Sequence, residues 1–509
     1  MAANTKPEAT AFVGRDTNTL LVPGGEQHGS DWRHWFKNPI AVRYGNTVTP
    51  LIDGAASFAN MYQALKTAND VSHFIYMLNW HLNLDLILSG TLDSKLENVL
   101  RDAVNKGVEV RAMLWNDMYK GAGLLIPGFL GGNGWNTAQV GRMNDKNNIP
   151  PTAHGDAIAI LDDNTLDWGS HHQKILIIFG EDGLIAFCGG IDFNRDRIEQ
   201  WGGQSGAPMH DVHCRIQGPA AKDLLRIFLN RWYDHPNTPA GSLRGSNIPN
   251  TSIIGDVYVQ IGRTYGNGTM HGGISNRRHL PYYSFAPQGE QTASEITIHA
   301  IRQAKKFIYM ENQYLVSLDV MQALRDQLDQ IKFLVILIPH TSISDLPQAW
   351  QRTKTFIDGL TLNNPNKVAV CYLINPLVRS QCTPQSIPNN MPHTYIHAKT
   401  YIIDDEFAII GSANCSRRCL THDSEVVAGI FHNPEDENVD KFAHFLRTKL
   451  WMEHLNKTYS DVSDPDSVRN EWFNPPTTSK IVRYNQNAGK DSGVNTDTDW
   501  NNIYDPNGQ

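Results

Sequence analysis

The feature that most constrains this chain is an internal repeat. Four short patterns occur twice, in the same order: FIYM at 74–77 and 307–310, LRD at 100–102 and 324–326, His-x-Lys at 172–174 and 397–399, and FLNRW at 228–232 with FLRTK at 445–449. The offset between the copies stays between 217 and 233 residues. Self-similarity at a nearly constant offset is typical of duplicated structural units. The chain is therefore predicted to fold as two similar halves.

Each half shows the same order of predicted elements: a strand, a helix containing LRD, a strand (108–115 and 332–339), the His-x-Lys strand, another strand and an amphipathic helix. Alternating strands and helices favour an α/β sandwich with a mixed or parallel sheet. We predict two similar α/β/α sandwich lobes related by a pseudo-two-fold axis, with an active site at their interface. The expected units are an N-terminal lobe at 30–250, a bridging strand and loop at 251–285, a C-terminal lobe at 286–456 and a polar extension at 457–509.

Composition narrows the class of partner. The 509 residues carry 44 Lys and Arg against 52 Asp and Glu, a formal net charge of −8. Nucleic acid usually selects a basic face, so no nucleic-acid partner is expected. The sequence has no apolar run of about 18 residues that would predict a membrane-spanning helix, and the N-terminus lacks the apolar core of a secretory signal. The six cysteines show no C-x-x-C spacing and are expected to be buried thiols. These features predict a cytoplasmic monomer, with export by a signal-independent secretion route as the alternative.

The two His-x-Lys stretches carry the predicted chemistry. Residues two apart on a strand point to the same face, so His172 is expected to share a face with Lys174, and His397 with Lys399. If the halves pack about a two-fold axis, two imidazoles and two ammonium groups converge on one cleft. The lysines would neutralise the non-bridging oxygens of a phosphodiester. One histidine would attack phosphorus, and the other would protonate the departing oxygen. This chemistry needs no cofactor and no metal, and no H-E-x-x-H or Cys/His ligand pattern occurs.

The two copies differ where the second His-x-Lys run ends in Asp404 and the first in Phe179. Asp404 lies seven residues after His397, an odd separation, so it is expected to point away from the catalytic face. We expect it to fix the turn behind the site. Phe179 is expected to pack in the core instead, while Asp182 in the following turn takes over the tie. Both copies are therefore predicted to be active.

A histidine base also needs an orienting carboxylate. Asp211, in MHDVHCRIQGP, and Glu425, in HDSEVVAGI, each follow a His-x-Lys pair and open a β-prone run. Asp192 in GGID and Asn414 in GSAN occupy matching places after the two pairs. Asn414 is expected to hydrogen-bond a phosphate or a lysine. Asp192 is expected at the site only if it pairs with a lysine, because a carboxylate repels phosphate.

These motifs resemble those of a known family. The stretch HAKTYIIDDEFAIIGSAN, 397–414, resembles the H-x-K-x4-D…G-S-x-N signature of the phospholipase D superfamily. HHQK, GGID, HDVHCRIQGPAA and IYMENQYL are similar to the fuller motif set of phospholipase D enzymes proper, in family order from about 70 to 455. The resemblance implies that His172 forms a phosphohistidine, that His397 is the acid, and that Asp211 and Glu425 orient the histidines. The expected substrate-binding residues are Asp192, Asn312, Gln313, Ser412 and Asn414.

The resemblance implies an activity but leaves alternatives open. The expected reaction is hydrolysis of glycerophospholipids such as phosphatidylcholine or phosphatidylethanolamine to phosphatidic acid and free headgroup, with transphosphatidylation to alcohols. A phosphatidyltransferase of the cardiolipin-synthase kind, a superfamily nuclease and a non-catalytic lipid-binding scaffold are the alternatives, because this fold does not decide the substrate. The departures from the family pattern are Phe179 and Cys419, where the family often has Ser after Arg418. The short upstream segment leaves no room for a calcium-binding module, so calcium dependence of the plant kind is not expected.

Several other segments are candidates for the site. The stretch GAGLLIPGFLGGNGW, 121–135, is apolar and too broken by glycine for a helix. It is expected to form a mobile loop with Trp135 at a phospholipid membrane surface, or else an ordinary buried loop. Residues 376–393 are expected to cover the cleft, and Trp80 and His81 to face it. His210 and His213 look like a metal pair, but a spacing of three places them on opposite faces of a strand, so no metal role is expected.

Overall fold

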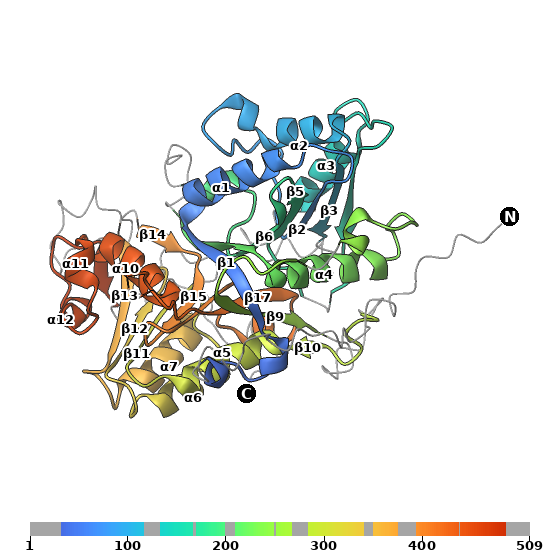
Figure 1. Cartoon of the computed structure of the whole chain (residues 1–509). Helices are drawn as coiled ribbons and strands as arrows, with labels where there is room; N and C mark the ends of the chain where they lie inside the picture. Colours follow the sequence, from blue (N-terminus) through green and yellow to red (C-terminus); the bar gives the residue numbers. More distant parts are fainter. Residues whose placement is uncertain are drawn as a thin grey trace.

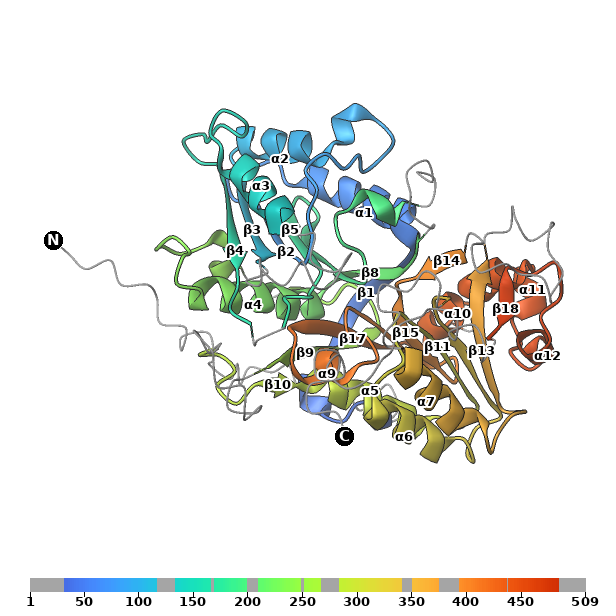
Figure 2. The ribbon, with the colours of Figure 1, turned by 180° about the vertical axis from the view of Figure 1, so that it is seen from behind.

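The computed structural model describes residues 32–116, 133–165, 169–198, 209–248, 251–266, 283–340, 350–374, 393–436 and 438–484. These residues form two lobes, each built on a mixed β-sheet with helices on both faces (Figure 1). Strand β1 (Arg43–Ile52) of the first lobe pairs antiparallel with β9 (Val257–Tyr265) of the second, close to the middle of the molecule (Figure 2). This pair joins the two sheets.

Among the described residues, the sheet of the first lobe contains seven strands. The neighbours β1, β8, β6, β5 and β2 run antiparallel to one another, whereas β2, β3 and β4 are parallel. The strands after β1 are β2 (Phe74–Asn79), β3 (Glu109–Trp115), β4 (Asp156–Asp162), β5 (Ile175–Gly180), β6 (Gly183–Gly189) and β8 (Val212–Gln217). A two-residue strand, β7 (Met209–His210), lies outside this sheet and pairs with the other lobe.

The sheet of the second lobe repeats this order. From β9 it runs through β17, β16, β15, β11, β12 and β13, and again only the last three are parallel to one another. These strands are β11 (Phe307–Asn312), β12 (Phe333–Leu337), β13 (Val368–Ile374), β15 (Lys399–Ile403), β16 (Phe407–Gly411) and β17 (Glu425–Phe431). The short strands β14 (His393–Ile396) and β18 (Ile481–Arg483) pair with β13, and β10 (Glu290–Gln291) pairs with β9. The identical strand order confirms the predicted pair of pseudo-symmetric lobes.

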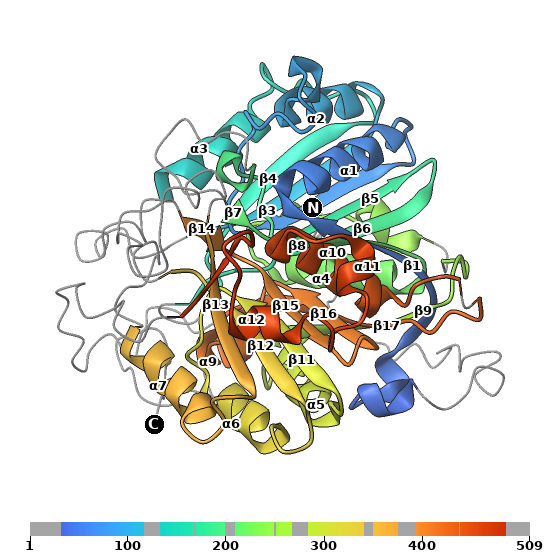
Figure 3. The same cartoon turned by 90° about the vertical axis from the view of Figure 1, so that its left-hand side faces the viewer.

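Helices cover both faces of each sheet. In Figure 3 the outer helices of the two lobes lie at opposite ends of the molecule. They are α1 (Asp53–Thr67), α2 (Leu96–Asn105) and α3 (Asn133–Asn144) in the first lobe, and α5 (Thr292–Gln303), α6 (Leu318–Gln327) and α7 (Trp350–Thr361) in the second. The inner helices are α4 (Pro219–Asp234) and α10 (Phe442–Leu455), followed by the short helices α11 (Tyr459–Val462) and α12 (Arg469–Phe473); α9 (Arg417–Thr421) precedes β17. The repeated motifs thus occupy equivalent elements: FIYM in β2 and β11, LRD in α2 and α6, and FLNRW and FLRTK in α4 and α10.

The alternation of strand side chains divides the core into layers. In β2, Ile75 and Met77 pack with the residues of α1 and α2, whereas Phe74 and Tyr76 pack with those of α4. The equivalent strand β11 alternates in the same way. One central core therefore contains the inner side chains of both lobes, together with α4 and α10. Burial of this shared apolar surface is the main force that holds the lobes in register.

The segment after α10 packs against the second lobe. Trp472 of α12 is fully buried and contacts the rings of Tyr309 and Trp451. Strand β18 extends the sheet beyond β13. Five cysteines in the described ranges are buried free thiols, as expected, while Cys382 lies outside those ranges. None of the helices in the described segments has the length and apolar character needed to cross a bilayer.

The two positions that differ between the repeats have different structural roles. The Asp404 carboxylate accepts hydrogen bonds from the backbone N–H groups of Lys305, Lys306 and Phe307, at 2.6, 2.7 and 2.9 Å. It therefore ties the β15–β16 turn to the start of β11, as predicted. Phe179 instead stacks on Phe74, with ring centroids 5.5 Å apart.

The prediction that Asp182 replaces this tie in the first lobe is wrong. Its side chain is exposed, and its backbone oxygen accepts from Gln217. The turn is held by the neighbouring Glu181, whose N–H donates to Thr67 O and whose carboxylate accepts from Asn69. The first lobe thus ties its β5–β6 turn to the end of α1 and the residues just after it, whereas the second lobe ties its β15–β16 turn to the start of β11.

Candidate active site

Both His-x-Lys pairs lie where the two lobes meet. His172 lies three residues before the first residue of β5, and His397 lies between β14 and β15, so both histidines stand just outside the regular strands in which they were expected. The backbone of each is held by the opposite lobe. His172 N–H donates to Ser424 O at 2.9 Å, and His397 N–H donates to His210 O at 2.8 Å. Because the next residues along the chain are Glu425 and Asp211, these bonds bring each carboxylate beside a histidine of the other lobe.

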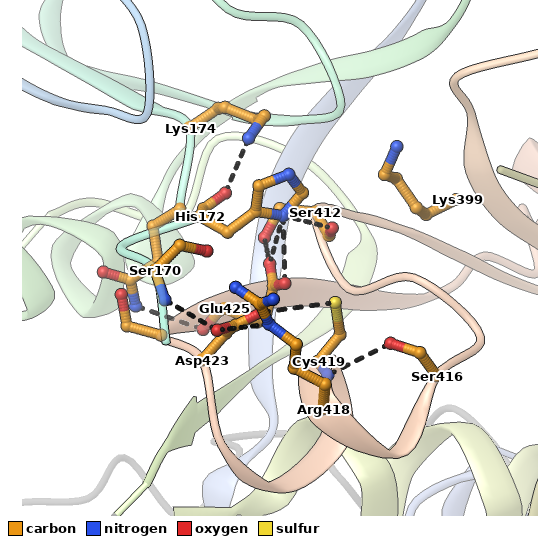
Figure 4. A network of polar contacts seen from close by, with 12 residues as sticks. Ser170, His172, Lys174, Lys399, Ser412, Ser416, Arg418, Cys419, Asp423 and Glu425 are labelled. Carbon is orange, nitrogen blue, oxygen red and sulfur yellow. Dashed lines mark hydrogen bonds and ion pairs between the residues drawn. The ribbon is translucent and has the colours of Figure 1, made fainter. Parts of the chain in front are cut away.

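The carboxylates are exchanged between the halves. His172 Nδ1 lies 2.9 and 3.1 Å from the two Glu425 oxygens, and His397 Nδ1 lies 2.6 Å from Asp211 Oδ2. The contact between His172 and Glu425 is visible in Figure 4. Each carboxylate follows the histidine of its own half in sequence but serves the histidine of the other. Each dyad therefore needs both lobes, and Nδ1 is occupied in both rings, which leaves Nε2 as the reacting atom.

The surroundings of both imidazoles disfavour their charged form. Burial lowers the pKa of His172 well below its ordinary value, and the charges of Lys174, Lys399 and Arg418 add to this effect. Burial likewise lowers the pKa of His397, together with the charges of Lys399, Arg197 and Lys174. Since the ammonium groups of both lysines act on both rings, the four groups form one site. A neutral imidazole with a free Nε2 lone pair is the form that a nucleophile requires.

The carboxylates are shifted in the opposite direction. Burial raises the pKa of Glu425 to about 8, with the Asp423 carboxylate adding to the increase. Burial raises the pKa of Asp211 to about 6, although the charges of Lys399 and Arg197 oppose this. The Ser412 hydroxyl donates to Glu425 Oε2, and Arg418 pairs with Asp423 at 2.9 Å. In each dyad the pKa of the carboxylate is raised and that of the imidazole is lowered, so the two groups titrate as a coupled pair that shares a proton.

The two lysines make the same backbone contact but have different neighbours. Lys174 Nζ donates to His172 O at 2.8 Å, and Lys399 Nζ donates to His397 O. Lys174 lies 3.4 Å from a carboxylate oxygen of Asp192, whereas Lys399 contacts the neutral amide oxygen of Gln313 at 2.8 Å. Burial lowers the pKa of Lys399 to about 7, and the charge of Lys174 adds to this. A bound phosphodiester anion would favour the charged form of Lys399, since among the described residues no carboxylate oxygen lies within 4.0 Å of its Nζ.

Known proteins are similar in sequence to this chain over most of its length. Residues 199–345 match a family described as "Phospholipase D", and residues 297–447 match one described as "Cardiolipin synthase, PLD-like domain". "Phospholipase D alpha 2" of Oryza sativa subsp. japonica is 22% identical over 79% of this chain and 64% of its own length. "Phospholipase D alpha 3" of Arabidopsis thaliana is 23% identical over 78% of this chain and 63% of its own length.

The chain belongs to the phospholipase D superfamily.

The fold has a solved relative. The structure of phosphatidylserine synthase from Haemophilus influenzae Rd KW20 superposes with a TM-score of 0.52, at 12% identity, over 84% of this chain and 95% of that one. This likeness confirms the predicted two-lobed phospholipase D fold. The chain spans just under two thirds of the length of the plant phospholipase D relatives.

Sequence reasoning missed two arginines near the histidine–carboxylate dyads. The Arg197 guanidinium lies 3.6 Å from the Asp192 carboxylate and is almost fully buried. Its charge acts on His397 and Lys399, while that of Arg418 acts on His172. A sequence signal was present: Arg197 follows GGID and Arg418 follows GSAN after similar short intervals.

The five predicted substrate-binding residues of this superfamily member divide into two groups. Gln313 contacts Lys399 and Asp192 contacts Lys174, as given above, and Asn414 is buried with an Oδ1 that has no hydrogen-bond partner among the described residues. Ser412 and Asn312 use their side-chain oxygens in the scaffold, and their contact with a substrate stays a prediction. The Ser412 hydroxyl is used by Glu425 and by Val426 N–H, and Asn312 Oδ1 accepts from Cys415 N–H at 2.9 Å.

An aromatic wall adjoins the first dyad. The Trp80 ring meets the His172 ring edge-on at 6.4 Å and lies 6.0 Å from Lys174 Nζ, so Trp80 lies at the site, as expected. His81 N–H donates to Asp192, and its ring stacks on Trp135 at 5.6 Å. Trp135 belongs to helix α3, which corrects the expectation that its segment is non-helical; residues 121–132 lie outside the described ranges. Of the predicted cleft cover, 376–393, residues 376–392 also lie outside them.

The two histidines considered as a metal pair face different surroundings. His213 Nδ1 accepts from Ile191 N–H at 3.3 Å, whereas His210 lies between two carboxylates. Three sets of described side chains have ligand-type atoms within 4.8 Å of one another: His172 with Cys419 and Glu425, His210 with Glu311 and His454, and Asp53 with His210 and Glu453. The first two sets have histidine–carboxylate contacts of 2.9–3.0 Å between their own members.

Proposed function

We propose that this chain is a phospholipase D, which hydrolyses glycerophospholipids to phosphatidic acid and free headgroup through a phosphohistidine. One observation carries the proposal: two imidazoles from different lobes each bind a carboxylate of the opposite lobe through Nδ1, beside two buried lysines. This arrangement supplies a nucleophile, an acid and charge stabilisation for a phosphodiester. Since one chain supplies both halves, the proposed active form is a monomer.

In the first step, the lone pair of His172 Nε2 attacks phosphorus in line with the headgroup oxygen. The P–N bond forms while the bond from phosphorus to that oxygen breaks. A proton on His397 Nε2 passes to the departing alcohol, so the headgroup leaves neutral at that oxygen. Lys174 and Lys399 stabilise the charge on the non-bridging oxygens. Asp211 stabilises the protonated state of His397, which the anionic diester also favours.

In the second step, His397 accepts a proton from water as its oxygen attacks the phosphatidyl-His172 phosphorus. The P–O bond forms, the P–N bond breaks, and the electron pair returns to His172 Nε2. The products are phosphatidic acid and the starting enzyme. An alcohol in place of water gives a phosphatidyl alcohol with the same atom balance, which is the proposed transphosphatidylation.

Three features support a lipid substrate. The plant relatives at 22–23% identity bear the name phospholipase D. The net charge of −8 does not favour a nucleic-acid substrate. Trp135, stacked on His81 beside the site, is 38% exposed and is proposed to meet the membrane interface. The proposed partner is thus a phospholipid surface bound peripherally.

A phosphatidyltransferase is the second candidate. It is favoured by the match of residues 297–447 to the family described as "Cardiolipin synthase, PLD-like domain". Both activities share the first step and differ only in the acceptor of the second. The two activities can therefore be distinguished by the lipid that the second step produces.

The test is incubation of the purified chain with liposomes of phosphatidylcholine and phosphatidylethanolamine, analysed by mass spectrometry. Parallel samples contain EDTA, ethanol, or glycerol with phosphatidylglycerol. Phosphatidic acid, with phosphatidylethanol when ethanol is present and no effect of EDTA, is the expected result. Cardiolipin or phosphatidylglycerol as the main product would favour the transferase. Cleavage of single-stranded DNA without any lipid product would overturn the proposal.

A further inference from the structure

A buried ionic cluster that the proposed mechanism does not use lies directly behind the His397–Asp211 dyad. At its centre, His210 of β7 places Nδ1 2.8 Å from Asp53 Oδ1 and Nε2 3.0 Å from Glu311 Oε2. His210 and Glu311 are almost completely buried. A neutral imidazole carries only one N–H, so it would turn a lone pair toward one of the two carboxylates. Nε2 is hydrogen-bonded to Glu311, whereas Nδ1 meets Asp53 at an ion-pair distance without hydrogen-bond geometry. Two carboxylates this close favour the doubly protonated ring, because a lone pair facing either one would be repelled.

The electrostatics of the cluster agree with this charge state. Burial by itself would lower the pKa of His210, but the Asp53 and Glu311 carboxylates raise it well above its ordinary value. Glu311 has two further partners, since His454 Nε2 lies 3.0 Å from Oε1 and the Tyr309 hydroxyl donates to the same oxygen at 2.5 Å. The pKa of Glu311 is held below its usual range against the effect of burial, with the His210 charge as the main opposing cause.

The cluster joins the two lobes at the strand that carries Asp211. Asp53 and His210 belong to the first lobe, whereas Glu311 and His454 belong to the second. Asp53 Oδ1 also accepts Asp211 N–H at 3.1 Å, and Asp53 N–H donates to Asp211 O at 2.8 Å. His210 O accepts His397 N–H. The His210 residue thus contacts, through its ring or its backbone, the groups that set the positions of both members of the dyad.

The backbone of Asp53 is strained in this arrangement. Asp53 has a φ of +64°, the left-handed region that side-chain-bearing residues seldom adopt. Such strain persists only where the surrounding contacts over-determine it, and it is concentrated at functional sites. Here the strained residue supplies both the carboxylate for His210 and the backbone contacts for Asp211.

We propose that His210 is a positioning residue: a permanently protonated imidazolium that clamps the two lobes and fixes the Asp211–His397 dyad for proton transfer to the leaving group. The inference rests on the proposed function, because it acts on the step in which His397 is the acid. His210 touches neither substrate nor reacting atoms. The other charged or titratable groups of the cluster are Glu453, His454 and Tyr309, with Lys480 paired to Glu453 at 3.2 Å.

The first test compares leaving groups in the full-length chain carrying His210→Gln. Phosphatidylcholine needs a proton on its departing oxygen, whereas a phosphatidyl p-nitrophenol ester does not. Because general acid catalysis contributes roughly 10²–10⁴-fold, we expect kcat on phosphatidylcholine to fall by about 30-fold or more, with KM nearly unchanged. The burst of p-nitrophenol should stay within about 3-fold of the unsubstituted chain. Equal losses on both substrates, or no loss on either, would overturn the inference.

The control is His444→Gln on α10, which removes another histidine paired with an aspartate, Asp440 at 3.0 Å. It should leave both substrates unaffected. If the unsubstituted chain cleaves neither substrate, the proposed function fails. If it cleaves both and the His210 variant loses both equally, only the inference fails. Should His210→Gln not fold, Asp53→Asn provides the same comparison with a smaller change in shape.

The second test observes the charge directly. Nitrogen-15 NMR of the histidine-labelled chain should reveal one imidazole with both nitrogens protonated at pH 8, and the signal should disappear in His210→Gln or shift in Asp53→Asn. Ordinary histidines are neutral at that pH. Absence of a doubly protonated ring at pH 8, or stoichiometric zinc or manganese in the purified chain, would contradict the assignment.

Discussion

The two His-x-Lys halves share a backbone plan but differ in the charge around their lysines. Lys174 has the Asp192 carboxylate 3.4 Å away, whereas the side-chain contact of Lys399 is with the neutral amide oxygen of Gln313. Among the described residues, Lys174 has a carboxylate oxygen within 4.0 Å and Lys399 has none, although the charges of Asp211 and Glu425 act on Lys399 from farther away. Burial lowers the pKa of Lys399 to about 7.

This difference shows that two copies of one fold can share their backbone arrangement and still differ in the charged groups around equivalent residues. The backbone symmetry brings two imidazoles together, while the unequal counter-ions give one lysine a stronger demand for an incoming anion. The histidines are unequal as well: one is served by a glutamate that Ser412 also contacts, the other by an aspartate that adjoins the His210 cluster. Such pairs of similar groups in unlike environments are how one site divides nucleophile and acid roles.

The largest expected effect tests that division of roles. His172→Ala should reduce both phosphatidylcholine hydrolysis and the p-nitrophenol burst by several powers of ten, since no phosphohistidine can form. His397→Ala should lose about 10²–10⁴-fold on phosphatidylcholine but keep most of the burst, because p-nitrophenol departs without an acid. Rapid-quench kinetics would measure both. The opposite pattern would assign the nucleophile to His397.

The next effect concerns stability and sharpens the comparison of the lysines. A pKa lowered from 10.5 to about 7 destabilises the folded chain by a few kcal/mol, on the order of 1.4 kcal/mol per unit, whenever the lysine is charged. Lys399→Met should therefore raise the free energy of unfolding, with the full gain below pH 7. The gain should fade between pH 7 and 10.5, since there the unfolded state still binds the proton and the folded state does not.

Denaturant titrations at pH 6 and pH 10 would measure this change. Lys174→Met is the matched control, because the Asp192 carboxylate would lose its nearest ammonium group and no gain is expected. Equal stabilisation by both substitutions would remove the proposed asymmetry between the halves.

A third comparison concerns the turn that differs between the repeats. Asp404→Ala leaves three backbone N–H groups without their acceptor, so unfolding should become easier by about 2–3 kcal/mol while kcat stays within about 2-fold. Asp182→Ala, at the exposed position of the first turn, should change stability by less than about 0.5 kcal/mol. Thermal unfolding and initial rates would check both. A large loss of kcat in Asp404→Ala would give this residue a direct catalytic role.

The smallest effect comes from exchanging the lysine partners. Gln313→Glu gives Lys399 a counter-ion and should raise KM for an anionic diester by about 10-fold, an energy of roughly 1.4 kcal/mol. It should also raise the pKa of Lys399 and move the alkaline limb of the pH profile to higher pH. Asp192→Asn removes the counter-ion of Lys174 and should lower KM by a few-fold. Shifts of KM in the same direction would show that the counter-ions do not control diester binding.

Much of the fold could be predicted because its signals are local and repeated. FIYM, LRD and the FLNRW-type helix each form one element by strand or helix periodicity, and the duplication places them in equivalent lobes. The side chains of His172, Lys174, His397 and Lys399 could be assigned to one cleft because the duplication implied an axis between them. Trp80 was found by the same offset.

The pairing of groups within the site could not be predicted, because it depends on contacts between residues far apart in the chain. Glu425 serves a histidine 253 positions away, and Asp211 one 186 positions away, each across the lobe interface. The burial that makes Ser412 and Asn312 scaffold residues arises from the same packing, as does the approach of Arg197 to Asp192. The sequence by itself thus determined which chemical groups the protein has and that they occur twice. Only the tertiary structure decided which carboxylate faces which imidazole and which lysine has a carboxylate beside it, since distance and desolvation depend on how the lobes pack.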